Sequence, residues 1–119
     1  MRINTYVSSL WLLGIIALAG CQSSKPLSYW GNYEGAAYTK YKTPGDAAPD
    51  IQIARLQEDL DKAAAKGLNP NPGLHAYLGF VYYEAGKMAE AAEEFEAEKR
   101  LYPESAQLMD RLIAKLKTK

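Results

Sequence analysis

The stretch from Leu74 to Pro103, LHAYLGFVYYEAGKMAEAAEEFEAEKRLYP, decides the fold because it contains two helix-period apolar patterns in succession. The first pattern has the i, i+4, i+7, i+8 spacing of one helix face and consists of Leu74, Leu78, Val81 and Tyr82. The second has an equivalent spacing and consists of Met88, Ala91, Ala92 and Phe95. The two patterns meet at Ala85-Gly86-Lys87, so the stretch is predicted to be a helical hairpin.

Residue sizes along this stretch fit two antiparallel helices in close contact. Gly79 and Ala91 are small where the helices would cross, and Tyr82 and Phe95 are bulky where they would interdigitate. Close packing needs this alternation of small and large side chains across a helix–helix interface. The sequence therefore predicts a tightly packed hairpin.

The hairpin resembles a tetratricopeptide (TPR) repeat, and the clearest repeat spans residues 72–105. The residues that match the TPR pattern are Leu78, Gly79, Tyr82, Tyr83, Gly86, Ala91, Phe95, Leu101 and Pro103. His75 stands where the family usually has Trp, and Glu98 stands where a small Ala is usual, which puts the packing at the end of the second helix in question. The resemblance implies a helical stack with a groove that binds protein segments.

The N-terminus is predicted to be a cleaved lipoprotein signal peptide covering residues 1–20. Met1-Arg2 is a short positive region, and a largely apolar run from Val7 to Ala19 leads into Leu18-Ala19-Gly20-Cys21. The motif resembles the lipobox of bacterial lipoproteins, in which the Cys21 thiol accepts diacylglycerol. A retained membrane helix is the weaker alternative because the run is shorter than about 20 residues. An ordinary buried thiol is the other alternative.

Residues 21–26 are predicted to be a lipidated tether. In lipoproteins of this kind an Asp after the Cys favours the inner membrane, and here Gln22 follows Cys21. We therefore expect an outer-membrane protein that is anchored by lipid and faces the periplasm. Cys21 is the one cysteine of the chain, which argues against a disulfide framework.

Residues 27–119 are predicted to form the TPR-like domain, beginning with an aromatic helix. Trp30, Tyr33, Ala37 and Tyr41 fall at i, i+3, i+7 and i+11, although two glycines weaken a helix here. These rings either pack on the next helix or form an exposed face for a partner. The first alternative is the commoner use of aromatic residues at helical spacing.

Two further helices complete the predicted domain. Asp50 is expected to cap a helix that runs to Lys66 and ends at Gly67, and its apolar face consists of Ile53, Leu56, Leu60, Ala63 and Ala64. With the aromatic helix it resembles a degenerate repeat before the clear one. A last helix opens at Glu104-Ser105, and its apolar face consists of Leu108, Met109, Leu112, Ile113 and Leu116. The fold class is thus all-α, a short right-handed TPR-like stack of about five helices with a C-terminal capping helix.

The sequence argues against catalysis, metal binding and nucleic-acid binding. His75 is the one histidine and Cys21 is assigned to lipid, so neither a nucleophile–base pair nor a metal site can be assembled. The 14 basic and 14 acidic residues balance, and no basic stripe is present to attract a polyanion. We therefore expect no enzyme activity, no cofactor and no small-molecule substrate.

The predicted partner-binding residues are aromatic. Tyr77, Phe80 and Tyr83 lie on the side of the first hairpin helix away from the Leu78 face and would line the groove of a TPR-like stack, with Ala76 beside them. Trp30 and Tyr33 are the candidates in the N-terminal segment. The alternative is that the hairpin rings pack on the Asp50 helix. His75 is expected to be a packing or groove residue.

Two functions follow from this sequence. The first is an interaction module that holds or assembles an envelope complex, and the second is a structural lipoprotein that acts as a homo-oligomer subunit without selective peptide binding. The Trp-Gly-Asn-Tyr-Glu segment at residues 30–34 resembles a family of small lipoproteins of unknown function. That resemblance implies an envelope partner similar to the curli secretion channel lipoprotein. Pilotins, which deliver secretins to the outer membrane, are a second analogy.

Overall fold

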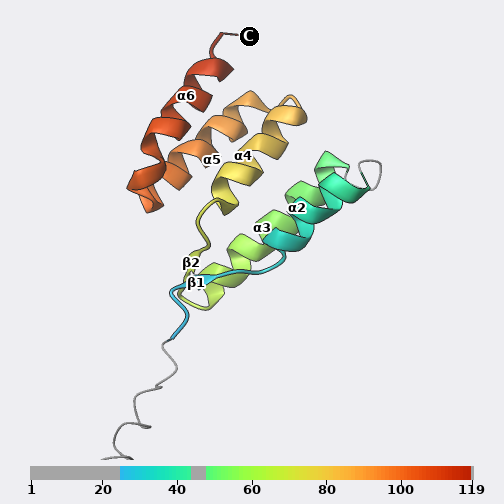
Figure 1. Cartoon of the computed structure of the whole chain (residues 1–119), viewed down its shortest axis with the longest axis vertical. Coiled ribbons are helices and arrows are strands. Elements are labelled where there is room, and N and C mark those ends of the chain that lie inside the picture. The colour runs from blue at the N-terminus through green and yellow to red at the C-terminus, as the bar shows by residue number, and fades with distance from the viewer. Residues whose placement is uncertain (1–24, 44–47, 119) are drawn as a thin grey trace, which may run out of the picture.

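The chain forms five α-helices and one very short parallel sheet in the residues that the computed structural model describes, 25–43 and 48–118. In chain order the elements are β1 (Ser28–Tyr29), α2 (Tyr33–Lys42), α3 (Pro49–Ala65), β2 (Asn69–Pro70), α4 (Leu74–Glu84), α5 (Met88–Leu101), a 3-10 turn (Pro103–Ser105) and α6 (Ala106–Leu116). Consecutive helices lie side by side and antiparallel, from α2 to α6 (Figure 1). The predicted all-α class is therefore confirmed.

The predicted hairpin is α4 and α5, which share the most extensive interface of the fold. Gly86 adopts a φ of +77° in the connecting turn, a conformation that L side chains rarely adopt. The N–H of Gly86 donates to the Tyr83 carbonyl at 3.0 Å, and the N–H of Lys87 donates to the Tyr82 carbonyl at 2.9 Å. This pair of bonds is a Schellman motif, which satisfies the last carbonyls of α4 and reverses the chain. The predicted turn is confirmed.

The buried core runs through all five helices, with α4 at its centre. Its buried apolar residues are Ala36, Ile53, Leu56, Leu78, Val81, Tyr82, Ala91, Phe95 and Met109. Leu56, Leu78 and Val81 are fully buried, because α4 lies between α3 on one side and α5 on the other. The apolar face predicted for α4 is therefore the face that the structure buries.

A buried carboxylate from α5 holds the start of α4. Glu98 is 2% exposed, and its Oε1 accepts the N–H of Gly73 at 2.7 Å while Oε2 accepts the N–H of Ala76 at 3.3 Å. The first N–H groups of a helix have no partner within the helix, and a negative charge there is favourable. Glu98 was expected to disturb this part of α5, but it instead caps the neighbouring helix.

A second buried carboxylate holds the start of α2 in the same way. Asp59 on α3 is fully buried, and it accepts the backbone N–H of Asn32 at 2.7 Å and the Asn32 side-chain amide at 3.3 Å. Beside this turn, β1 pairs with β2 in parallel, so that Ser28 is opposite Asn69 and Tyr29 is opposite Pro70. The β1–β2 pairing was not predicted, because it joins segments far apart in the chain.

The N-terminal aromatic helix is shorter than predicted. It begins at Tyr33, so Trp30 lies before it in the turn that follows β1. Gly31 in this turn has a positive φ of +28° and lies against the Asp59 carboxylate, which interrupts the helical path. Within α2 it is Ala36, not Ala37, that is buried, so the predicted stripe is rotated by one residue.

Helix α3 begins two residues earlier than predicted, because its N-cap is Ala48 and not Asp50. Pro49 occupies its first turn, where the missing N–H costs nothing, and Asp50 lies inside the helix without a side-chain capping bond. The expected C-terminus is confirmed, since Gly67 has a φ of +62° and the N–H of Leu68 reaches the Ala63 carbonyl at 3.0 Å. The buried face includes the polar residues Gln52 and Asp59, whereas Ala64 is exposed.

Helix α6 packs on α5 and completes the described part of the chain. Met109 is 2% exposed and is its fully buried residue, while Leu112, Ile113 and Leu116 are partly buried against the core. Leu108 is 56% exposed, although it was predicted to be on the packed face. The reason is that the packed face is centred on Met109, one residue away.

Candidate functional site

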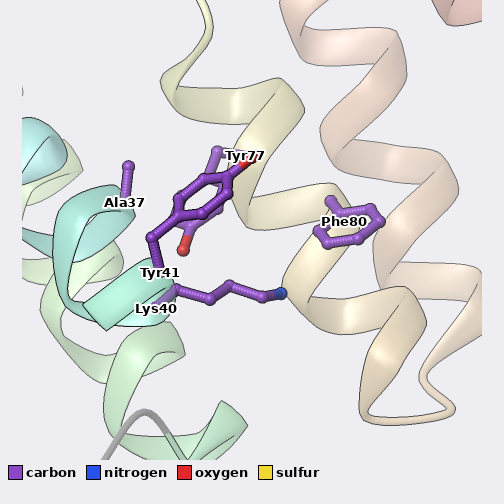
Figure 2. Close-up of a pocket in the computed structure, with 5 residues that line it drawn as sticks. All are labelled: Ala37, Lys40, Tyr41, Tyr77 and Phe80. Carbon is purple, nitrogen blue, oxygen red and sulfur yellow. The ribbon is translucent and has the colours of Figure 1, made fainter. Parts of the chain in front are cut away.

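Two apolar hollows lie side by side on one face of the domain, and Phe80 forms part of both. The first has a volume of about 490 Å³, and its lining residues are Ala37, Lys40, Tyr41, Tyr77 and Phe80 (Figure 2). The second has a volume of about 220 Å³, and its lining residues are Phe80, Tyr83, Phe95, Leu112, Lys115 and Leu116. We call the two hollows together the α2–α4–α6 groove, because these helices line most of it.

Alternate helices of the stack build this groove, and α4 supplies its middle. Tyr77, Phe80 and Tyr83 recur every three residues on α4, so they follow one side of the helix while Leu78 and Tyr82 face the core. Phe80 is 41% exposed, whereas Tyr77 and Tyr83 are half-buried against the core. The predicted aromatic strip is therefore present, with Phe80 as its most accessible ring.

Tyr77 belongs to both the groove and the interior. Its hydroxyl donates to Oε1 of Gln52 on α3 at 2.7 Å, and its ring meets Tyr33 edge to face with centroids 5.8 Å apart. Burial raises the pKa of Tyr77, with smaller contributions from Glu84 and Tyr33, so the phenol stays a neutral donor at physiological pH. The alternative that the hairpin rings pack on the Asp50 helix, which is α3, is therefore correct for Tyr77.

The charged residues that line the groove are lysines. Lys40 extends from α2 toward α4, where its ammonium pairs with the Glu84 carboxylate and lies 4.4 Å from the centre of the Phe80 ring (Figure 2). Lys115 lies at the edge of the second hollow. The groove therefore combines apolar walls with an ion-paired lysine at the first hollow and Lys115 at the second, and Lys115 suits a carboxylate next to apolar side chains.

The other predicted site residues lie away from this groove or outside the described residues. Cys21 precedes the part of the chain that the structure describes, so its lipidation stays a prediction. Tyr33 is partly buried, and its ring packs edge to face against Tyr77. Trp30 is 53% exposed before the N-terminal end of α2, whereas Lys40 and Tyr41 are at the C-terminal end of that helix. Trp30 is therefore separate from the aromatic strip of α4.

His75 joins the two helices of the hairpin. Its Nδ1 lies 2.6 Å from Oε2 of Glu94 on α5, and both side chains are mostly buried. His75 is thus a packing residue of the hairpin and does not line either hollow. Across the described residues, no cluster of three or more His, Cys, Asp or Glu side chains could hold a metal ion.

Sequence reasoning missed the contributions of α2 and α6 to the groove. Ala37 and Tyr41 were recognised in a stripe that either packs on the next helix or forms an exposed face, and Leu112 and Leu116 in a second stripe, but neither stripe was assigned to the groove. Their spacing of four residues shows that each pair shares a helix face. Nothing in that spacing says that the two faces border the same groove.

The described residues form a small all-α domain with an apolar, lysine-edged groove, and none of the helices described is long and apolar enough to cross a membrane. Residues 27–112 match the protein family described as Domain of unknown function (DUF4810). The chain belongs to this family. No curated protein and no solved structure matches the chain significantly.

Proposed function

We propose that this protein is a non-catalytic interaction module, anchored by lipid at Cys21 to the outer membrane and facing the periplasm, that binds an envelope protein through the α2–α4–α6 groove. The observation that carries the proposal is the position of Phe80. This ring is 41% exposed between two apolar hollows, although most large apolar residues of α4 are buried. Exposed aromatic rings in a hollow are efficient anchors for a protein partner.

The groove favours a partner segment of definite chemistry. Apolar side chains of the segment would enter the two hollows on either side of Phe80, and a carboxylate next to the second hollow would meet Lys115. Charge complementarity of this kind sets the register of a bound segment and speeds its association. We therefore propose an extended or helical segment with two apolar anchors and an acidic residue.

The repeat interpretation supports this proposal. In each helical hairpin, a buried carboxylate of the second helix holds the start of the first, Asp59 for α2 and Glu98 for α4. This shared device favours two related repeats in a TPR-like stack, with α6 as the cap. In such a stack the first helices of the repeats line one face, as α2 and α4 do here.

We propose that the partner is a component of an envelope or secretion complex that this protein helps to assemble or stabilise. The lipoprotein family resembled by residues 30–34 makes a lipoprotein similar to the curli secretion channel the first candidate. Under this proposal Cys21 anchors this protein to the outer membrane, and the partner would be a lipoprotein of the same membrane. The groove would then hold an acidic, apolar segment of that partner.

The proposal is tested by crosslinking in cells with the full-length, lipidated protein. A photoreactive amino acid at Tyr41, which is 90% exposed at the edge of the first hollow, should form an adduct with an envelope protein. Phe80→Ala and Lys115→Glu should abolish that adduct. The matched controls Ile51→Ala and Lys117→Glu change similar groups outside the groove and should preserve it.

The adduct also reports the chemistry of the partner. Peptide mapping should place the crosslink in a segment with apolar residues and a carboxylate. An adduct of equal yield in the Phe80→Ala variant and in both controls would contradict the groove assignment.

The alternative function is a structural envelope subunit that assembles with copies of itself. The exposure of Tyr38 at 60% and of Leu108 at 56% favours it, because both could be covered in an oligomer. The same experiment separates the alternatives, since an adduct consisting only of two copies of this chain supports the oligomer. Sedimentation of the purified protein in detergent would then give the number of copies.

A further inference from the structure

We propose that the β1 end of the domain rests on the lipid bilayer, with Leu27 and Trp30 entering the boundary between headgroups and acyl chains. This inference rests on the proposed function, because it requires the lipid anchor at Cys21. It adds a contact surface of the folded domain, and it gives the groove a fixed direction relative to the membrane.

The exposure of two large apolar side chains next to β1 is the first observation. Leu27 is 91% exposed and Trp30 is 53% exposed, although they flank a strand that is itself packed against β2. Tryptophan has an apolar body and a polar N–H, so it suits the wet, partly apolar boundary of a bilayer. A leucine exposed to this extent contributes most where it can enter acyl chains.

Two lysines lie close to β1. Lys25 is exposed two residues before Leu27, and the ammonium of Lys66 lies 4.6 Å from the centre of the Tyr29 ring on β1. Lysines beside an apolar insertion attract anionic lipid headgroups. The β1 end therefore presents both kinds of group that a membrane-surface contact requires.

The spacing from the anchor is the second observation. Leu27 is six positions after Cys21 in the sequence, so the connection spans at most about 20–22 Å when fully extended. A headgroup layer is itself roughly 5–7 Å thick, and an unextended connection is shorter than the maximum. The anchor therefore keeps Leu27 near the lipid surface, where even a weak contact has a high effective concentration.

This contact would direct the groove away from the membrane. The described chain begins at the β1 end of the domain, where β2 and the C-terminal end of α3 also lie (Figure 1). Lys40 and Tyr41 line the first hollow from the opposite end of α2. The first hollow would thus be exposed to the periplasm, where a partner segment can reach it.

Tryptophan fluorescence tests the contact directly. The chain contains Trp11 and Trp30, and removal of residues 1–20 leaves Trp30 alone. The lipidated protein, purified in detergent and returned to vesicles of phosphatidylethanolamine and phosphatidylglycerol, should show emission shifted to the blue. Lipids brominated near the headgroup end of the acyl chains should quench that emission, and aqueous acrylamide should quench it less than it quenches a tryptophan placed at position 41.

A matched reporter at the other end of α2 provides the control. In a variant with Trp30→Phe and Tyr41→Trp, the emission should be quenched by acrylamide and unaffected by brominated lipid. Protection of Trp30 from acrylamide without quenching by brominated lipid would mean that protein covers it, and this would refute the contact.

Mass spectrometry of the same preparation distinguishes failure of the bilayer contact from failure of the lipid anchor. Acyl chains on Cys21 together with a Trp30 that brominated lipid does not quench would overturn this inference and leave the anchor intact. A protein without acyl chains would overturn the proposed anchor, and the bilayer contact with it.

Discussion

Replacing Gly79 by alanine adds one methyl group where α4 packs tightly against α5. A Cβ atom there would lie 2.7 Å from Cε1 and 2.8 Å from Cδ1 of Phe95, and 3.1 Å from the Ala91 carbonyl oxygen. Phe95 is 2% exposed and the carbonyl is part of α5, so neither can move away without disturbing the hairpin. Overpacking of this kind costs about 1–3 kcal/mol in a well-packed core.

The expected magnitude must include the helix preference of alanine. Alanine is favoured over glycine by about 1 kcal/mol inside a helix, which offsets part of the overpacking cost. Gly35→Ala isolates this term, because Gly35 lies within α2 and a Cβ there meets no atom within 4 Å. The Gly79→Ala variant should therefore be less stable than the Gly35→Ala variant by about 1–3 kcal/mol.

Thermal unfolding followed by circular dichroism measures this difference. In a domain of this size, 1 kcal/mol corresponds to a shift of the melting temperature of about 4–8 °C. The two alanine variants should differ by at least this amount, with Gly35→Ala at or above the parent protein. Equal melting temperatures would refute the close approach of α4 and α5 at Gly79.

A double-mutant cycle identifies the contact that causes the loss. Phe95→Leu removes the ring atoms nearest to the added methyl group, so Gly79→Ala should cost less in the Phe95→Leu background. Coupling between residues in contact is typically about 0.5–3 kcal/mol. Additive effects would mean that Phe95 is not the obstacle.

Three further predictions follow from the buried polar groups. Glu98→Ala should lower the free energy of unfolding by about 2 kcal/mol, because it leaves two N–H groups of the α4 start unpaired; urea unfolding with the exposed Glu104→Ala as control checks this. Asp59→Ala should cost a similar amount, about 2 kcal/mol, and should increase amide hydrogen exchange at the α2 start; unchanged exchange there would contradict its capping role. Burial raises the pKa of Tyr77 and Tyr82 above their ordinary value of 10.0, so these phenols lose their protons at lower pH in the unfolded chain than in the folded one. Their contribution to the free energy of unfolding should therefore be fully present below pH 10 and decrease above it. Melting temperatures measured between about pH 8 and 11 should fall less for Tyr77→Phe than for the parent protein.

The hairpin was predictable from the sequence because the information for it is local. The apolar spacing of Leu74, Leu78 and Val81 identifies a buried helix face, and Gly86 is needed for the turn that follows. Gly67 ends α3 for the same reason. In each case the residues that interact lie within one or two helical turns of one another.

The capping roles of Glu98 and Asp59 could not be predicted from local sequence patterns. Glu98 lies 25 residues from Gly73, and Asp59 lies 27 residues from Asn32. An acidic residue in a predicted helix is assigned to the solvent-exposed face unless its distant partner is known. The late start of the aromatic helix has the same origin, since the turn at Gly31 and Asn32 is held by Asp59 from another helix.

The candidate groove was also predictable only in part. Tyr77, Phe80 and Tyr83 could be placed on one side of α4 from their spacing alone, because helical periodicity determines which residues share a face. Which of these rings is accessible depends on what covers them: Gln52 of α3 binds the Tyr77 hydroxyl, while Lys40 of α2 lies over the still accessible Phe80 ring.

The sequence by itself determined the helical class, the α4–α5 hairpin and the aromatic side of α4, because these depend on neighbours within a few residues. Only the tertiary structure decided that α2 and α6 border the same groove as α4, and that Lys40 and Lys115 lie at its two hollows. The physical reason is that helix periodicity fixes the face of each helix, whereas the relative placement of helices is set by packing between residues far apart in the chain.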